Sequence, residues 1–355
     1  MKKLISIIFI FLFSYSKLFS FEINLEKIFD GLTGPWSFSF IDKDNILITE
    51  KRGNLIHVNL EKKKKVNILH NLKILEDGQG GLMEVLYHDG SVFVSYSENR
   101  GNGKTSTSVA KAKYNNNKLK FKNIFRAEPP INSGYHFGSR LEIKDNLLFI
   151  TVGERGKGMI AQDPSKHPGS IIRIHLNGDI PRDNPKFKDK KNWLPEIYQI
   201  GVRNPQGLAF SPFDKKIYMT NHGAKGGDWF GEVKYGENYG WKILGWGGTN
   251  YSGTKIGPKW KPGFTKPIKY WVPSIAVSSM IIYKGEEFKE WNGNALITSL
   301  KDETLSKLKF SKNKILNEKI ILRSNIGRIR DIEINKKDGK IFLLSDQGSL
   351  WKLSK

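Results

Sequence analysis

The stretch RLEIKDNLLFITVGE, residues 140–154, carries the pattern that decides the fold. Apolar and polar residues alternate on both sides of the short polar segment at residues 144–146, and the second apolar segment ends at Thr151 to Glu154. Alternating segments joined by a turn rich in Asp, Asn or Gly are typical of a β-hairpin. We therefore expect two antiparallel strands here, with polar residues just after the second strand.

The same hairpin pattern occurs six times along the chain. The six copies begin at Trp36, Leu82, Arg140, Gly207, Met280 and Arg330. Further short apolar segments follow several copies, which gives roughly four strands in each unit. Such a repeat predicts an all-β fold, a six-bladed β-propeller with four-stranded antiparallel blades around a channel, forming a single domain over residues 21–355. A large β-sandwich or two β domains would also alternate, but the count of six and the absence of any long helical pattern favour the propeller.

Residues 1–20 predict a secretory signal peptide. Two lysines precede an apolar run at residues 4–13, and small residues follow at Ser16 and Ser20, where cleavage would fit. The run is too short to cross a bilayer of about 30 Å as a helix, and no other stretch is long and apolar enough. We therefore expect a protein exported to the periplasm or secreted, without a membrane span.

Composition excludes several classes of function. The chain has no cysteine, which rules out disulfides, thiol catalysis and thiolate metal sites. The net charge is +23, or +20 once three lysines leave with the signal, but the lysines are scattered. The positive charge favours an anionic ligand, whereas the scatter of the lysines and the expected export argue against a nucleic acid. The motifs of zinc proteases, serine hydrolases, P-loop enzymes and Rossmann dehydrogenases are absent.

Polar residues follow the second strand of most repeats. They are Glu50, Glu154, His222, Lys301 and Asp346. In a radial array, equivalent strand ends gather on one face, and loops carried by a rigid scaffold are where sites usually lie. The repeat therefore predicts a site at one mouth of the channel.

Several motifs, in order, identify a resemblance. They are GQGGL (residues 78–82), HFGSRL (136–141), AQDPSKHPGSIIRI (161–174), NGDIPRDNP (177–185), VRNPQGLAF (202–210), HGAKGGD (222–228), ENYGW (237–241), NYSG (250–253) and RIRDI (328–332). With them, residues 34–353 resemble the soluble glucose/sorbosone dehydrogenases, and most closely the aldose sugar dehydrogenases that use pyrroloquinoline quinone (PQQ). That family has a six-bladed propeller, in agreement with the repeat count.

The resemblance implies a cofactor site built from cations. PQQ carries three carboxylates and an ortho-quinone, and arginine binds carboxylates bidentately while lysine adds a point charge. The residues implied to contact PQQ are Gln79, Arg203, Asn204, Tyr251, Lys301, Arg328 and Arg330. The alternative for Arg328 and Arg330 is a surface ion pair with Asp331.

The resemblance also implies the chemistry. His136 would be the base that takes the C1 hydroxyl proton of an aldose as a hydride moves to the quinone, and Arg203 would stabilise the negative charge on the quinone oxygen. From the residues alone, His136 would more often be a packed, half-buried histidine than a base.

Calcium is the second implied cofactor. By resemblance, the backbone carbonyls of Gly223 and Ala224 hold a Ca²⁺ ion that polarises the quinone. Related sequences bind another, structural calcium with a glutamate at the position of Trp229 and the backbone at Tyr239. Tryptophan cannot be a ligand, so we do not expect this second site in its usual form. Asn221 also replaces the usual acid before the histidine.

Two other classes of function stay open at this point. One is a calcium-dependent lactonase or hydrolase, which would need a cluster of carboxylates and asparagines in the channel. The other is a propeller that binds sugar or protein without catalysis, which would be expected to have lost His136 or the cationic set. The sequence leaves open which aldose is oxidised, which acceptor takes the electrons, and whether the protein is a monomer or a homodimer.

Overall fold

The computed structural model describes residues 23–187 and 191–355. The predicted signal at residues 1–20 lies outside the described residues. Within them, the chain forms 25 strands and two short 3-10 helices, η1 (Gly158–Gln162) and η2 (Lys289–Trp291). None of the helices in these two ranges has the length and hydropathy needed to cross a membrane.

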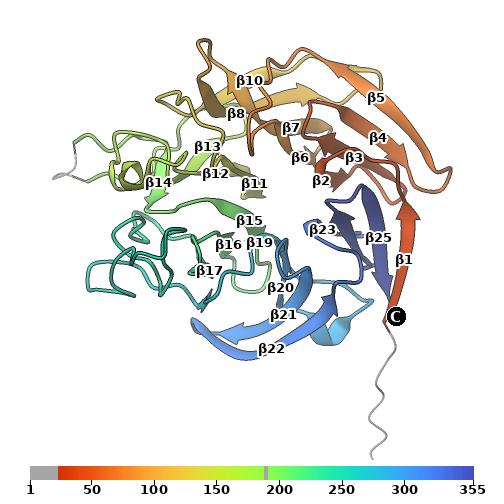
Figure 1. Cartoon of the computed structure of the whole chain (residues 1–355). Helices are drawn as coiled ribbons and strands as arrows, with labels where there is room; N and C mark the ends of the chain where they lie inside the picture. The colour runs from red at the N-terminus through yellow and green to blue at the C-terminus, as the bar shows by residue number, and fades with distance from the viewer. Residues whose placement is uncertain (1–22, 188–190) are drawn as a thin grey trace, which may run out of the picture.

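The strands form six sheets around a central channel, as Figure 1 shows. Blade 1 holds β2 (Pro35–Phe40), β3 (Asn45–Glu50), β4 (Leu55–Asn59) and β5 (Lys64–His70). Blade 2 holds β6 (Leu82–His88), β7 (Ser91–Asn99), β8 (Thr105–Lys113) and β10 (Lys122–Arg126). Blade 3 holds β11 (Gly138–Lys144), β12 (Leu147–Val152), β13 (Ser170–His175) and β14 (Ile197–Ile200).

The remaining blades follow in chain order. Blade 4 holds β15 (Pro205–Phe210), β16 (Ile217–Asn221), β17 (Asp228–Glu232) and β18 (Lys269–Trp271). Blade 5 holds β19 (Val277–Ile282), β20 (Ala295–Ser299), β21 (Thr304–Ser311) and β22 (Lys314–Arg323). Blade 6 holds β23 (Ile329–Ile334), β24 (Ile341–Ser345), β25 (Ser349–Ser354) and β1 (Asn24–Phe29). The predicted six-bladed, mainly four-stranded propeller is confirmed.

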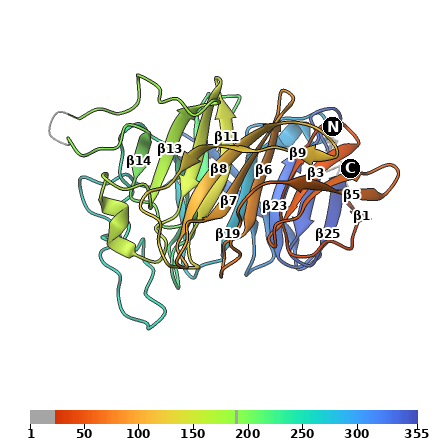
Figure 2. The same cartoon turned by 90° about the horizontal axis from the view of Figure 1, so that it is seen from above.

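The six hairpins predicted from the repeat are the two innermost strands of each blade. Each innermost strand contacts the innermost strand of the next blade, and β23 contacts β2, so the ring is closed. Seen edge-on in Figure 2, the strands run roughly along the channel axis, and the loops gather on two faces. The loops that enter the innermost strands lie on the same face as the ends of the second strands, because each hairpin is antiparallel.

Two features of the sheets differ from a plain four-strand repeat. The N-terminal strand β1 completes blade 6 by antiparallel pairing with β25, with Leu25 opposite Leu353, so the two ends of the described fold are joined. The short strand β9 (Lys118–Leu119) adds a fifth, parallel strand to blade 1. Leu119 and Phe121 are buried there, which fixes this segment over the outer edge of β5.

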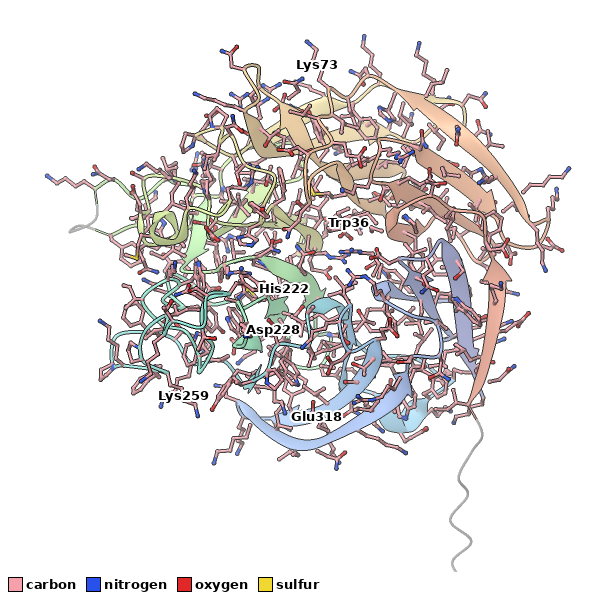
Figure 3. All side chains as sticks on the ribbon, in the orientation of Figure 1. Trp36, Lys73, His222, Asp228, Lys259 and Glu318 are labelled. Carbon is pink, nitrogen blue, oxygen red and sulfur yellow. The ribbon has the colours of Figure 1, made fainter. Side chains whose placement is uncertain are left out.

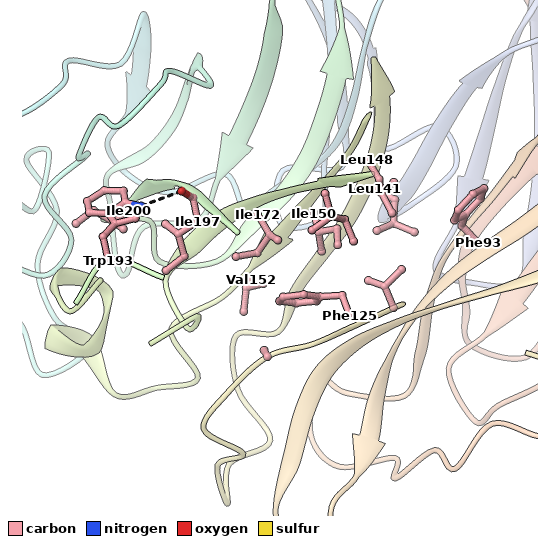
Figure 4. Close-up of a cluster of buried hydrophobic side chains, with 13 residues drawn as sticks. Phe93, Phe125, Leu141, Leu148, Ile150, Val152, Ile172, Trp193, Ile197 and Ile200 are labelled. Atoms are coloured by element: carbon pink, nitrogen blue, oxygen red, sulfur yellow. Dashed lines mark hydrogen bonds between the residues drawn. The ribbon is translucent and has the colours of Figure 1, made fainter. Parts of the chain in front are cut away.

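The apolar core lies between neighbouring blades. Figure 4 shows one such cluster, where Phe93 and Phe125 of blade 2 pack near Leu141, Leu148 and Ile150 of blade 3. Since each sheet is covered on both faces, its middle strands are buried along most of their length, as in β12. This packing makes the blades a rigid frame for the loops at the channel mouth.

Candidate active site

A cavity of 280 Å³ lies at the channel mouth, and all six blades or the loops entering them line it. Its lining includes Trp36, Lys51, Gln79, Phe137, Asn204, His222, Leu300, Arg328 and Arg330. Figure 3 shows Trp36 and His222 toward the centre of the ring, whereas Lys73, Lys259 and Glu318 lie on its outer side. The structure thus brings together four residues that the sequence assigned to the cofactor, on repeats that are far apart in the chain.

His136 stands beside this cavity in the loop that enters β11. Its backbone N–H donates to Oε1 of Gln79 at 2.9 Å, and its φ of 50° is in the left-handed region. Its Nδ1 atom lies 2.5 Å from Oε1 of Glu154. Burial lowers the pKa of His136 below its usual value, and the positive charges of Arg203 and Arg155 act in the same direction, while the Glu154 hydrogen bond opposes them. The imidazole is therefore neutral at pH 7.

Glu154 holds the imidazole in one orientation. Burial alone would raise the pKa of Glu154, but the hydrogen bond with His136 and the nearby positive charge outweigh it, and the net pKa is lowered. The other carboxylate oxygen accepts the backbone N–H of Gly158 at 2.5 Å. An ionised acceptor at Nδ1 assigns the ring proton to Nδ1, which leaves the lone pair of Nε2 free to accept a proton. The sequence placed Glu154 only at the mouth and missed this pairing.

Arg203 is a buried cation next to the same pair. Its backbone carbonyl accepts the N–H of Glu154 at 2.8 Å, which ties the two loops together. Among the described residues, its guanidinium meets the Trp241 ring at 5.2 Å, the carbonyl of His222 at 3.5 Å and the phenol of Tyr251, none of them a carboxylate. Burial accordingly lowers the pKa of Arg203. A buried guanidinium in this setting is well suited to an anionic ligand.

Two asparagines fix the backbone around Arg203. Oδ1 of Asn221 accepts the N–H groups of Arg203 at 3.0 Å and Asn204 at 2.9 Å. Oδ1 of Asn204 accepts the N–H of Gly138 at 3.0 Å, next to the His136 loop. The amide of Asn221 thus supplies one acceptor oxygen to two successive backbone N–H groups.

Arg328 and Arg330 both pair with Asp346. Their Nε atoms each lie 2.9 Å from the Asp346 carboxylate, one on each oxygen. The alternative that they pair with Asp331 is wrong, because the carboxylate of Asp331 lies 2.7 Å from Nη1 of the buried Arg140. The two arginines are therefore held in place at the cavity wall by an acid on the neighbouring strand end.

Three of the expected mouth residues have other contacts. Nζ of Lys301 donates to the carbonyl of Ser274 at 3.0 Å. Tyr251 is 75% exposed, and it interacts with Arg203. Glu50 does not line the cavity, because its carboxylate accepts the N–H of Thr33 at 2.6 Å and a side-chain N–H of Asn54 at 2.8 Å.

A buried ionic group packs against Trp36, one of the residues that line the cavity, and sequence reasoning missed it. Nη1 of Arg140 lies 2.8 Å from Glu84 and 2.7 Å from Asp331, and its guanidinium stacks 4.4 Å from the Trp36 ring. Burial raises the pKa of Glu84 to about 8. These side chains come from β6, β11 and β23, so they connect three blades beneath the site.

The loop that carries the candidate calcium carbonyls is tightly folded. Oδ1 of the buried Asp228 accepts the N–H of Gly223 at 2.8 Å and the hydroxyl of Ser274 at 2.7 Å. A Cβ atom on Gly223 would lie 2.3 Å from the carbonyl oxygen of Gly226, so only glycine fits. The carbonyl of Ala224 also lies 3.0 Å from the Ser274 hydroxyl, so the single proton of that hydroxyl is shared between this carbonyl and Oδ1 of Asp228. That carbonyl keeps one lone pair for a cation.

Trp229 packs against Tyr239 at the place of the second calcium. The two rings stack with centroids 4.2 Å apart, inside a cluster that includes Val233 and Leu244. The hydroxyl of Tyr239 donates to the carbonyl of Glu232 at 2.8 Å. An apolar stack supplies no ligand at Trp229, so these residues do not fit a bound cation.

The comparisons with known proteins agree with the fold and show the family. A family model described as glucose / sorbosone dehydrogenase matches residues 32–352. The aldose sugar dehydrogenase YliI of Escherichia coli strain K12 is 34% identical over 348 residues, which are 94% of this chain and 93% of that protein.

Two solved structures extend the comparison. The E. coli soluble aldose sugar dehydrogenase in its apo form superposes with a TM-score of 0.88 at 33% identity, covering 94% of this chain and 99% of that one. The PQQ-bound aldose sugar dehydrogenase of Streptomyces coelicolor has a TM-score of 0.77 at 19% identity, covering 94% of this chain and 98% of that one. The second likeness concerns the fold alone.

Proposed function

The chain belongs to the glucose/sorbosone dehydrogenase family, and from this premise we propose that it oxidises the C1 hydroxyl of aldose sugars to lactones with PQQ as the hydride acceptor. The observation that carries the proposal is the pairing of His136 with the ionised Glu154 beside a cavity lined by cationic and amide side chains. A neutral imidazole held by a carboxylate is the arrangement that a general base needs.

The cations at the mouth fit a ligand with three carboxylates. Within the described residues the buried Arg203 guanidinium forms no ion pair, although the charges of Glu154 and Asp228 act on it, and Arg328 and Arg330 are held at the cavity wall. Gln79 and Asn204 add amide groups to the lining, and Lys301 and Tyr251 would complete the set that the family resemblance implies. When bound, PQQ would supply the electrophilic quinone carbon that takes the hydride.

A calcium ion is the second part of the proposal. The carbonyls of Gly223 and Ala224 would hold it, since calcium accepts neutral oxygen ligands in tolerant geometry, and Ala224 would share its carbonyl with Ser274. The ion would act as a Lewis acid toward the quinone oxygen. We do not propose the second calcium, because Trp229 and Tyr239 form an apolar stack instead.

The chain's own residues then divide the work. Nε2 of His136 accepts the proton of the C1 hydroxyl as the C1–H bond breaks and the lactone C=O forms. Glu154 keeps Nε2 as the acceptor and stabilises the imidazolium that results. Arg203 places a fixed positive charge where negative charge develops, at no reorganisation cost.

One experiment tests this function. The purified cofactor-free protein is titrated with PQQ in the presence of Ca²⁺ by calorimetry, and reduction of an artificial dye is then followed with a panel of aldoses. Saturable PQQ binding and dye reduction that depends on both sugar and PQQ would support the proposal. Absence of PQQ binding to the folded protein would overturn it.

The structure supports the two competing functions, a calcium-dependent lactonase and a non-catalytic propeller, less well. The described residues contain no group of three or more His, Asp or Glu side chains placed to hold a metal, which a calcium-dependent lactonase would use. A non-catalytic propeller has no reason to keep His136 paired with Glu154 beside the cavity. Export through residues 1–20 stays a proposal, which N-terminal sequencing of the mature protein tests.

A further inference from the structure

Arg155 lies directly after Glu154, and no part of the mechanism above uses it. It is 2% exposed, and its φ of 58° puts it in the left-handed region that side chains other than glycine rarely adopt. A buried arginine with a strained backbone conformation is unusual where the side chain serves only to fill the core.

The guanidinium holds the segment that precedes His136. Its Nε atom donates to the carbonyl of Tyr135 at 2.9 Å, and Nη2 donates to the carbonyl of Ser133. On its other side, Nη1 donates to the carbonyl of Thr105 at 3.0 Å, and Nη2 donates to the Thr105 hydroxyl at 2.8 Å. Arg155 thereby joins the start of β8, in the neighbouring blade, to the loop that carries the candidate base.

Two further contacts complete this hold. The backbone N–H of Arg155 donates to the carbonyl of His136 at 3.2 Å, and its guanidinium stacks 3.6 Å from the ring of Phe137, the residue after the base. The loop is fixed on its opposite side by Gln79, which accepts the His136 N–H. Residues 133–137 are thus clamped between Gln79 and Arg155.

The hydrogen-bond partners of the Arg155 side chain are neutral, although the charges of Asp77 and Glu154 act on it. All four side-chain hydrogen bonds that the described residues give Arg155 end on carbonyl or hydroxyl oxygens. Burial lowers the pKa of Arg155 to about 10, so the group is still charged at neutral pH. Leaving a charge in such surroundings is costly, and the planar fork of arginine is the side chain that can reach three carbonyls at once.

We propose that Arg155 is a positioning residue for proton abstraction: its guanidinium fixes residues 133–137 so that the imidazole of His136 stands in one place at the cavity. The proposal rests on the proposed function, in which His136 is the base. Displacing a reacting group by about 1 Å costs on the order of 100-fold in rate, so such a clamp has a measurable effect on turnover.

The charge of Arg155 has a second effect on the same ring. The charged and titratable groups that act on His136 are Glu154, Arg203 and Arg155, with the buried His222 beyond them. Glu154 favours the imidazolium, whereas the two arginines disfavour it. Removing the charge of Arg155 therefore raises the pKa of His136, and the acid limb of the kcat/KM profile moves to higher pH.

Two substitutions separate the clamp from the charge. Arg155→Met removes both, and we expect kcat to fall about 100-fold with the acid limb moved to higher pH. Arg155→Lys keeps the positive charge but loses the planar guanidinium with its several N–H donors. We therefore expect kcat to fall about tenfold, while the acid limb of the kcat/KM profile stays in place. PQQ affinity should stay within about threefold in both, because the hydrogen bonds of the Arg155 side chain do not end on the residues that would hold the cofactor. A folded Arg155→Met protein with wild-type kcat would overturn the proposal.

A matched control and a second variant guard against a trivial loss of fold. Arg173→Met removes another buried arginine of blade 3. The Arg173 guanidinium lies 2.6 Å from the Asp183 carboxylate and makes no contact with the His136 loop in the described residues. The kcat of this variant per folded molecule should equal that of the wild type. Should Arg155→Met not fold, Arg155→Lys carries the test alone. The tenfold loss then supports the clamp, and an unchanged kcat refutes it.

A measurement without turnover keeps this inference distinct from the proposed function. In the cofactor-free protein, the His136 ring signals, assigned by their loss in His136→Gln, are followed by NMR against pH. In Arg155→Met they should broaden or split, and the pKa should rise. Identical His136 signals in wild type and Arg155→Met would sink the proposal. A wild-type protein that binds no PQQ would instead refute the proposed function. The NMR comparison of the His136 signals could still be interpreted in that case.

Discussion

Nδ1 of His136 and Oε1 of Glu154 lie 2.5 Å apart, although the two residues are 18 positions apart in the chain. The contact joins the loop entering the innermost strand of blade 3 to the end of its second strand. It exists because a hairpin returns the chain to the face from which it set out. The pair therefore depends on the rigid blade beneath it.

Replacing the base should abolish turnover and spare the cofactor. In His136→Gln, we expect kcat to fall by about 100-fold or more, since a positioned general base contributes about 10²–10⁴-fold. PQQ affinity should change little, because the charged residues that would hold the cofactor are untouched. Stopped-flow dye reduction and calorimetric PQQ titration measure the two quantities. A His136→Gln enzyme that oxidises sugars at the wild-type rate would remove His136 from the mechanism.

Neutralising Glu154 should change both the rate and its pH dependence. Glu154→Gln keeps a side chain of similar shape but loses the charge that stabilises the imidazolium, so kcat should fall about tenfold or more. Because Glu154 favours protonated His136, its loss lowers the pKa of the imidazole further. The acid limb of kcat/KM should therefore move to lower pH, opposite to the shift expected for Arg155→Met. A limb that stays in place or moves upward contradicts the assigned role.

The inner hairpins of the six blades could be predicted from the local sequence pattern. The strands β1 and β9, which pair with segments far away in the chain, could not. Hairpin alternation around a polar turn marks each pair of inner strands, because one face of each repeat must pack on the next blade. The pairing of β1 with β25 joins Leu25 to Leu353, and no local signal encodes a contact over that separation. The short strand β9 was not predicted for the same reason, because its partner β5 lies far away in the sequence.

The site was predictable where a motif fixes a residue type. Gln79, Asn204, Arg328 and Arg330 do meet at one cavity. Partners were not predictable, because they depend on how loops from different blades approach. The acid that holds Arg330 is Asp346, which the sequence placed at the mouth without a partner. The role of Arg155 is likewise invisible before the 133–137 loop is folded against it.

Removing one cation from the cavity wall should weaken cofactor binding. In Arg330→Met, PQQ affinity should fall about 10- to 100-fold, since a hydrogen bond to a charged group contributes about 1.5–3 kcal/mol. Arg323→Met, which removes an exposed arginine at the end of β22, is the matched control and should bind PQQ as the wild type does. Calorimetry on the cofactor-free proteins gives both values. Equal affinities for the two variants would exclude Arg330 from the cofactor site.

The stack of Trp229 on Tyr239 predicts how this chain differs from relatives that carry a glutamate there. Trp229→Glu places a carboxylate in an apolar cluster, and we expect it to cost about 3–5 kcal/mol of unfolding free energy at pH 7. Trp229→Phe keeps an aromatic ring and should lose much less. The unfolding temperatures of the cofactor-free proteins are measured in EDTA and in excess Ca²⁺. The change that Ca²⁺ causes in the wild type is the baseline for the variants. Because Tyr239 faces position 229 with an aromatic ring at 4.2 Å, added calcium should not restore the stability of Trp229→Glu. If Ca²⁺ stabilises that variant well beyond its effect on the wild type, the remaining ligands of a second site are intact, and the stack merely replaces one of them.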